Sequence, residues 1–430
     1  MPHISPLHRI CLGACLLALF DTRHTIVKTF DLKTASKETN LIKPNHRSVK
    51  SLPQTSNTSH RLQQVDTSLE QMYENIMDPQ IDTRDYTIHD PSRIIATSGQ
   101  QMIAVTGKAQ EDGYDCGIET WYRPSFSGDS WKPGQCLLRT KPQWVDEEIS
   151  GQDGAYWAPE LISEHVLLYS VSKFDADKPN TCIGLATATG TFPNQMIWTD
   201  VGEPLSCMIG GDYEEERSII DPSTFRSFDN ELYLVSGGGV IIGTQLNTET
   251  YMPISGDWYS EENDAWKDIA RGPKDDVDDF DWVEAAYILP NAEEGYYYLF
   301  VNWGACCSGV KSTYEIRTGR SENPLGPYVD KNGVDMMDGG GSLFLGNVDY
   351  MIGPGHLGEY VRDSEQIFSY HYYDRRRGGN SWIAERRLVF KDGWPEAAEL
   401  VSSFSGETNC LRSSLNSLLL SFSCFYFFCS

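Results

Sequence analysis

Short apolar runs separated by turn-forming residues dominate the middle of the chain. The runs at 166–171, 232–235 and 296–301 are rich in β-branched and aromatic residues, and Gly, Asp, Asn and Pro lie between such runs. Runs of this length and composition are typical of strands. No long stretch of residues 82–400 keeps the 3.6-residue period of an amphipathic helix. The pattern therefore predicts an all-β domain over residues 81–400.

A repeat runs through this domain. Short motifs centred on Pro91, Pro159, Pro222, Ala286 and Pro354 recur at spacings of 68, 63, 64 and 68 residues. Each motif is followed closely by a strand-like segment. Five evenly spaced units, each long enough for four strands with generous loops, fit the blades of a propeller. The repeat therefore predicts a five-bladed β-propeller.

In three of the repeat motifs an acid stands before the central residue, namely Asp90, Asp221 and Glu284. Because equivalent ends of all blades meet at the propeller axis, the repeat predicts that these carboxylates converge. Most acids on propeller loops face water, and only the link to the repeat sets these three apart. Three converging acids match what inverting glycoside hydrolysis needs, namely a general acid and a general base. The third carboxylate would raise the pKa of the acid.

The two ends of the chain differ from the middle. Residues 1–20 place Arg9 before a short apolar stretch, which predicts a signal peptide and a secreted, extracellular protein. Residues 21–80 are polar and predict a linker or disordered arm. Residues 401–430 form a Ser-rich tail with an apolar end, typical either of a lipid-anchor signal or of a misread gene end. These bounds leave residues 81–400 as the catalytic domain.

The net charge of −26 bears on the class of partner. Residues 1–80 carry 9 Lys and Arg against 7 Asp and Glu, so the acidic excess falls on the remainder of the chain. Such a surface repels nucleic acids and anionic membranes. We expect neither as a partner. A neutral polysaccharide suits the charge better.

Six cysteines lie in the predicted domain, and in a secreted protein they are compatible with disulfides. The sequence leaves their pairing open. Adjacent Cys306 and Cys307 could bond to each other, bond to separate partners or stay as free thiols. No pair of Cys motifs has the spacing of a zinc site. The six are Cys116, Cys136, Cys182, Cys207, Cys306 and Cys307.

The repeat motifs and several later ones carry a resemblance to a known family. The matching stretches lie at 89–92, 156–160, 220–223, 283–285, 303–307, 312–317, 319–321, 326–330, 339–341 and 353–356. Over residues 82–396 the chain resembles glycoside hydrolase family 43, and within it the arabinan endo-1,5-α-L-arabinosidases. The resemblance implies a five-bladed propeller, an inverting mechanism and plant cell-wall arabinan as the substrate. We expect a monomer that needs no cofactor for the chemistry.

The resemblance also implies roles for individual residues. Asp90 matches the general base, Glu284 the general acid and Asp221 the residue that tunes the pKa of the acid. Trp157 matches an aromatic side chain that lines the sugar cleft. Trp303 either lines the cleft as well or belongs to the core.

His356 matches a family histidine near a cation, often calcium, on the propeller axis. A hydrogen-bonded core histidine is an equal alternative. The chain departs from the family in having Ala286 where Pro is usual and Leu357 where Asn often follows the histidine. The second departure weakens the calcium prediction. Ala286 in place of Pro makes the backbone less restricted, but Glu284 is kept.

Other functions remain open at this point. Within the family they are exo-acting α-L-arabinofuranosidase and β-xylosidase, which differ in how loops close the cleft. A non-catalytic carbohydrate-binding propeller is a further alternative, although it would be expected to lack one of the acids, as would a protein-interaction propeller. An acidic run precedes Glu284 and either adds to its electrostatic field or forms a solvated loop. Its members are Asp275, Asp276, Asp278, Asp279 and Asp281.

Overall fold

The computed structural model describes residues 87–400, except 98, 109–115, 125–130, 174–179, 194, 210–216, 261, 274–281 and 363. The predictions for residues 1–20, 21–80 and 401–430 and for the acidic run before Glu284 lie outside the described residues. Within the described part, no helix has the length and apolar character needed to cross a membrane.

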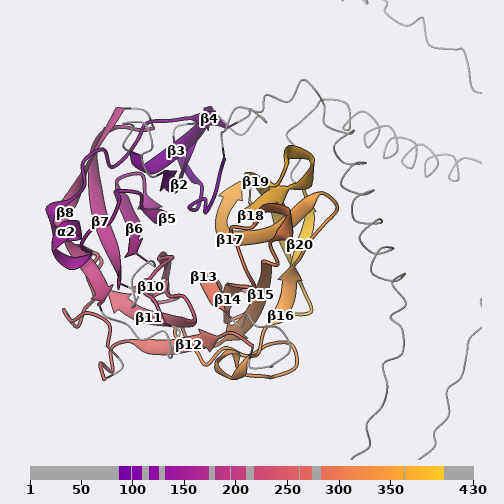
Figure 1. Cartoon of the computed structure of the whole chain (residues 1–430). Helices are drawn as coiled ribbons and strands as arrows, with labels where there is room; N and C mark the ends of the chain where they lie inside the picture. The colour runs from indigo at the N-terminus through magenta and orange to yellow at the C-terminus, as the bar shows by residue number, and fades with distance from the viewer. Residues whose placement is uncertain are drawn as a thin grey trace, which may run out of the picture. The chain divides into compact units, whose positions relative to one another are not determined.

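The described residues form five antiparallel sheets of four strands each, arranged as a ring (Figure 1). The first blade contains β1 (Ile95–Thr97), β2 (Gln100–Lys108), β3 (Cys116–Pro124) and β4 (Lys132–Pro133). The second contains β5 (Trp157–Ser163), β6 (Val166–Lys173), β7 (Asn180–Thr191) and β8 (Gln195–Met208). The third contains β9 (Ser223–Arg226), β10 (Leu232–Ser236), β11 (Val240–Leu246) and β12 (Lys267–Arg271).

The last two blades repeat the same order. The fourth contains β13 (Val283–Asn291), β14 (Tyr296–Trp303), β15 (Glu315–Ser321) and β16 (Ser342–Leu345). The fifth contains β17 (Met351–Arg362), β18 (Glu365–Asp374), β19 (Asn380–Lys391) and β20 (Trp394–Leu400). The described helices are short, namely α2 (Gln143–Glu148), η1 (Gly309–Lys311), η2 (Met336–Asp338) and η3 (Arg375–Arg377). The prediction of an all-β, five-bladed propeller is confirmed.

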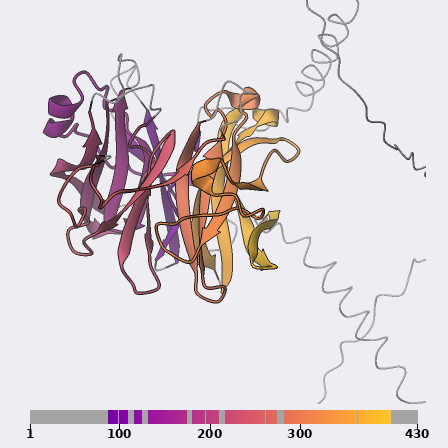
Figure 2. The same ribbon diagram turned by 90° about the horizontal axis from the view of Figure 1, so that it is seen from below.

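The hydrophobic core is divided among the spaces between neighbouring blades. One cluster joins the first two blades and includes Ile118 and Tyr169, both buried. Another joins the fourth and fifth blades and includes Phe300 and Phe368. Figure 2 shows the strands side-on, running across the thickness of the ring. Because each blade buries both faces against its neighbours, its strands are apolar on both sides, as in the fully buried pattern of β6.

Side-chain contacts between the fifth and first blades close the ring. Arg123 of β3 pairs with Glu385 of β19, with Nη1 and Oε1 2.8 Å apart. Trp121 packs edge-on against Trp382, with ring centroids 5.8 Å apart. Both blades are built from consecutive strands. Among the described residues, closure therefore rests on interactions between blades and not on a strand shared between the chain ends.

The repeat marks a left-handed backbone position in every blade. The φ angles are 46° at Asp90, 43° at Ala158, 54° at Asp221, 54° at Ala285 and 57° at Gly353. A non-glycine residue with positive φ is uncommon, and such residues gather at functional sites. The repeated motif thus encodes a sharp change of backbone direction at the start of each innermost strand.

The structure confirms the position of the fifth repeat. Its left-handed residue Gly353 directly precedes Pro354, as the left-handed residues of the other four units directly precede their central residues. In the fourth unit Ala285 takes this position, and Glu284 lies one residue before it. Ladder pairing is interrupted there, between Glu284 and Tyr287. A bulge of this kind re-aims the side chains beside it.

A charged cluster links the innermost strands next to the carboxylates. The guanidinium of Arg93 donates to the carboxylate of Glu160 and to the backbone carbonyl of Thr224. It also lies over the ring of Tyr287, 5.6 Å from the centroid. Burial raises the pKa of Glu359 to about 7, although the charge of Arg93 opposes the rise. All five blades therefore meet around Arg93.

Glu359→Gln is expected to flatten the pH dependence of stability. The folded protein holds the Glu359 proton up to about pH 7, whereas the ordinary carboxyl pKa is 4.5. The contribution of this proton to the free energy of unfolding is fully present below pH 4.5. It is lost as the pH rises through 7. The loss is at most about 3 kcal/mol. Urea unfolding at pH 5 and pH 8 should show this fall in the wild type and less of it in the variant. Equal slopes in both would contradict the prediction.

The structure pairs all six cysteines of the domain. Cys116 bonds to Cys136, and Cys182 bonds to Cys207. The latter two face each other directly across β7 and β8. The third bond joins the neighbours Cys306 and Cys307. The pairing that the sequence left open is thus local within the first, second and fourth blades.

Candidate active site

Asp90, Asp221 and Glu284 come together near the inner strands of three blades. Asp90 precedes β1, Asp221 precedes β9, and Glu284 is the second residue of β13. Oδ2 of Asp221 accepts the backbone N–H of Ala285, 3.1 Å away and next in sequence to Glu284. The charges of Glu284 and Asp90 both raise the pKa of Asp221. The convergence expected from the repeat is therefore present.

Hydrogen-bond donors and imidazole rings surround Asp90. Its Oδ2 accepts from Oγ1 of Thr106 at 2.7 Å and lies 2.8 Å from Nδ1 of His89. Its Oδ1 lies 3.7 Å from Nδ1 of His356 and 3.4 Å from Nδ1 of His371. The Asp90 amide donates to Nδ1 of His371 at 3.3 Å, which makes that nitrogen an acceptor.

These neighbours keep Asp90 ionised. Burial opposes its ionisation, but the charge and hydrogen bond of His89 hold the pKa of Asp90 well below its usual range. Burial lowers the pKa of His356 and His371, so both rings are neutral. For His89, burial is outweighed by Asp90, and its pKa is raised. Asp90 is thus a carboxylate able to accept a proton.

Glu284 has the opposite character. Burial raises its pKa, and the charge of Asp90 adds to the rise. Two hydrogen bonds work against the shift: Tyr314 donates to Oε1, and Nε1 of Trp282 donates to Oε2 at 2.6 Å. The net pKa of Glu284 remains raised. A carboxyl group in this state can donate a proton near neutral pH.

Asp221 is the most enclosed of the three acids, with 8% of its surface exposed. Burial raises its pKa well above normal, followed by the charges of Glu284 and Asp90, while the Ala285 amide opposes the rise. Because Asp221 and Glu284 are buried together, they cannot easily both be charged. The pair therefore retains a proton to a higher pH than either carboxyl would in water.

Tyr314→Phe is expected to extend activity to higher pH. The Tyr314 hydroxyl bonds to Glu284 and lowers its pKa, because the bond favours the charged carboxylate. Removing the hydroxyl raises the pKa of Glu284, so the protonated acid persists to higher pH. The basic limb of the kcat profile should move up by roughly one pH unit. A downward shift, or no shift with intact folding, would contradict this.

The two candidate sugar-binding tryptophans have different surroundings. Trp157 begins β5 and is half-buried, one residue before the left-handed Ala158. Trp303 ends β14, packs against the core between the third and fourth blades, and lies 4.7 Å below the guanidinium carbon of Arg317. Its contacts are those of a structural residue. The sugar-binding role of both residues stays a prediction.

The side chains near the axis do not fit a calcium site made by protein ligands. Among the described residues, His89, Asp90 and His371 can bring ligand atoms within 4.8 Å of one another, and His356 is outside that group. Calcium prefers six to eight oxygen ligands, whereas Asp90 is the only oxygen donor here. Nδ1 of His89 and Nδ1 of His371 already contact Asp90. The chemistry below therefore uses no metal.

Four residues that contact the acids have no role predicted from the sequence. His89 and Tyr314 lie inside the motifs that were singled out, and Trp282 lies directly beside one. Their adjacency to the acids was a usable signal. His371 lies within the buried strand β18 and had no local signal. Only the contact between the fifth and first blades places it at Asp90.

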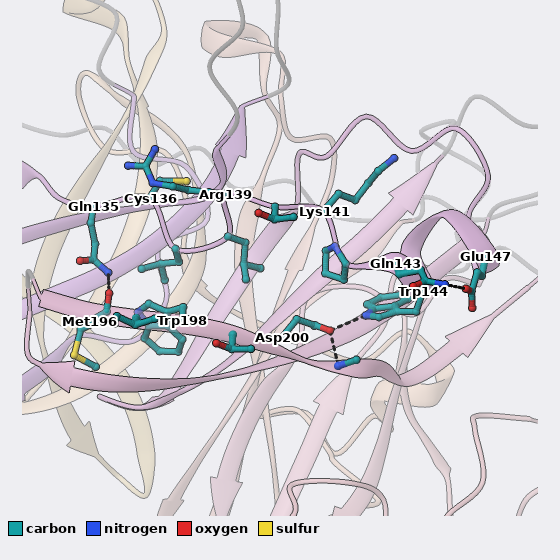
Figure 3. Close-up of a pocket in the computed structure, with 17 residues that line it drawn as sticks. Gln135, Cys136, Arg139, Lys141, Gln143, Trp144, Glu147, Met196, Trp198 and Asp200 are labelled. Carbon is teal, nitrogen blue, oxygen red and sulfur yellow. Dashed lines mark hydrogen bonds between the residues drawn. The ribbon is translucent and has the colours of Figure 1, made fainter.

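A separate cavity of about 880 Å³ opens between α2 and β8 of the second blade (Figure 3). None of the three acids lines it. Two of its polar side chains bond within the protein: Asp200 accepts from Trp144 at 3.0 Å, and Gln135 donates to the Met196 carbonyl at 2.8 Å. The cavity is distinct from the acidic site.

A five-bladed propeller that gathers an ionised carboxylate and a carboxyl of raised pKa near its axis is the architecture of a glycoside hydrolase. A family model for glycosyl hydrolases family 43 matches residues 128–395. The chain belongs to this family and is an O-glycosyl hydrolase. Asp90 lies before the matched range, so its placement rests on the geometry above.

The chain is also similar to individual proteins. It is 28% identical to the extracellular exo-α-(1→5)-L-arabinofuranosidase of Cellvibrio japonicus, over 63% of this chain and 78% of that protein. It is 29% identical to the extracellular endo-α-(1→5)-L-arabinanase 1 of Bacillus subtilis, over 72% and 87%. The crystal structure of an exo-1,5-α-L-arabinanase from a bovine ruminal metagenomic library matches with a TM-score of 0.61 and 30% identity, covering 75% of this chain and all of that one.

Proposed function

We propose that this enzyme cleaves α-1,5-linked L-arabinofuranose bonds in plant arabinan with inversion. The observation that carries the proposal is the contrast between Asp90, held ionised, and Glu284, whose pKa is raised. Asp90 removes a proton from the attacking water, and Glu284 protonates the departing glycosidic oxygen. Asp221 keeps the proton on the Asp221–Glu284 pair and positions the Ala285 backbone beside Glu284. The chemistry needs only carboxyl groups and water.

The choice of arabinan is supported by the relatives, which are named for α-1,5-arabinan linkages. The test is release of reducing sugar from debranched linear arabinan, arabinoxylan and an aryl β-xyloside. We expect activity on linear arabinan that disappears in Glu284→Ala. Activity confined to the xyloside would overturn the substrate but keep the acid and base. Binding of arabinan without hydrolysis by the folded wild type would favour a carbohydrate-binding propeller.

Endo action on arabinan is the proposed mode, and exo action is the alternative. The relatives include an exo-acting arabinofuranosidase and an endo-acting arabinanase, so they support either mode. The two are separated by the early products from long arabinan. An endo enzyme releases a ladder of oligosaccharides, whereas an exo enzyme releases short products of one size. Proton NMR of the first products distinguishes inversion, which yields the β-anomer, from retention.

We also propose that residues 1–20 direct secretion, that residues 21–80 are a linker and that residues 81–400 act as a monomeric catalytic domain. The support is the apolar stretch near the start of the chain and the extracellular names of the relatives. N-terminal sequencing of protein secreted from a eukaryotic host should begin after residue 20. Protein retained in the cells with residues 1–20 intact would contradict the proposed secretion.

A further inference from the structure

The disulfide between Cys306 and Cys307 lies beside the proposed general base. It belongs to the segment that joins β14 to η1, and the two Cα atoms are 3.8 Å apart. Cys307 is exposed, and its Sγ lies 4.0 Å from Nε2 of His89. The base of this segment is fastened, since Ala305 exchanges hydrogen bonds with the Thr313 hydroxyl at 3.0 Å and the Ser312 hydroxyl at 2.6 Å.

Three consecutive contacts connect this disulfide to Asp90. The backbone N–H of Cys307 donates to the Tyr373 hydroxyl at 2.7 Å. That hydroxyl lies 2.8 Å from Nε2 of His89. Nδ1 of His89 lies 2.8 Å from Oδ2 of Asp90. The His89 ring is also stacked on His371, with centroids 4.2 Å apart, so its position depends on Tyr373 at one edge and His371 on one face.

The backbone conformation at Cys307 depends on the disulfide. Cys307 has a φ of +63°, a conformation that is unfavourable for a non-glycine residue and persists only when its surroundings impose it. The bond to Cys306 ties the two side chains together and restricts this turn. Once the bond is open, Cys307 can adopt a negative φ, and its amide then loses its alignment with Tyr373.

We propose that the Cys306–Cys307 disulfide and Tyr373 are positioning groups for Asp90, and that reduction of this bond by a dithiol reversibly lowers turnover. The inference rests on the proposed role of Asp90. The dithiol breaks the S–S bond, two Cys thiols form, and the reagent closes to its own disulfide, so two electrons and two protons pass to the protein. The loosened loop frees Tyr373, and His89 no longer holds Asp90 in one orientation.

The three disulfides differ in access to a reductant. Cys116 and Cys136 are 2% and 7% exposed, and Cys182 and Cys207 are 0% and 3% exposed. Cys307 is exposed. Because thiol–disulfide exchange requires the attacking thiolate to reach a sulfur atom, dithiothreitol should open the Cys306–Cys307 bond first in the folded protein.

The experiment treats the folded enzyme with dithiothreitol, maps new thiols by alkylation and mass spectrometry, and measures kcat and KM on linear arabinan. We expect alkylation at Cys306 and Cys307, a fall in kcat of about 10-fold, a KM changed less than twofold, and recovery on reoxidation. Tyr373→Phe should lower kcat similarly, with the same melting temperature. Because Tyr373→Phe already removes the hydroxyl that links Cys307 to His89, reduction of the disulfide should lower kcat little further in this variant.

Two controls keep the outcome interpretable. Tyr372→Phe alters the neighbouring buried tyrosine, whose side chain points to the other side of β18, and should leave kcat and its thiol sensitivity unchanged. Asp90→Asn tests the underlying mechanism. Full kcat after confirmed reduction of the bond, or in Tyr373→Phe, while Asp90→Asn is inactive, would overturn the positioning role alone. An active Asp90→Asn would overturn the proposed function as well.

Discussion

Glu284→Gln is expected to slow hydrolysis of linear arabinan by about 10³-fold or more. The glutamine keeps the shape of the side chain: its amide oxygen can still accept from Trp282, and its NH2 group can donate to the Tyr314 hydroxyl. It carries no acidic proton. The glycosidic oxygen must then leave as an alkoxide. Steady-state kinetics on linear arabinan measures the loss, and a thermal melt shows whether the variant folds.

A substrate with a better leaving group separates acid catalysis from a merely structural effect. In an aryl α-L-arabino-oligosaccharide the leaving group is a stabilised phenolate. Its departure needs little protonation. Glu284→Gln should therefore retain most of its activity on the aryl substrate while losing it on arabinan. Equal losses on both substrates would remove Glu284 from the role of general acid.

Asp90→Asn is expected to abolish turnover on both substrates, with a loss of about 10³-fold or more. The amide cannot take a proton from water, and the leaving group does not change that requirement. Asparagine can still accept from the Thr106 hydroxyl, which bonds to Asp90 at 2.7 Å in the wild type, so the local structure should persist.

The comparison of the two variants assigns the acid and the base independently of the pH profile. An aryl substrate that restores Asp90→Asn but not Glu284→Gln would reverse the proposed roles. Substrate binding provides the matched control, because neither change removes a side chain that the inverting mechanism uses to hold the sugar. Arabino-oligosaccharide affinity, measured by calorimetry, should differ from wild type by less than about 10-fold in both variants.

The strands and the five-fold repeat could be predicted from sequence because both are local properties of the chain. The apolar runs at 166–171, 232–235 and 296–301 became parts of β6, β10 and β14. The motif before each innermost strand set the order of the blades, and propeller geometry then implied that Asp90, Asp221 and Glu284 would meet. The fifth motif follows the same rule, because Gly353 precedes Pro354 with a φ of 57°.

The surroundings that give the acids their chemistry depend on tertiary structure. His89 meets Tyr373 across 284 residues, and Cys307 meets Tyr373 across 66. No local pattern records such contacts, because they arise only when the fifth blade packs against the first and the fourth. By itself the sequence determined which carboxylates are present and which blades carry them. Ring closure decided which one stays ionised and which keeps its proton, since burial and neighbouring charges, rather than residue type, set the pKa of a carboxyl group.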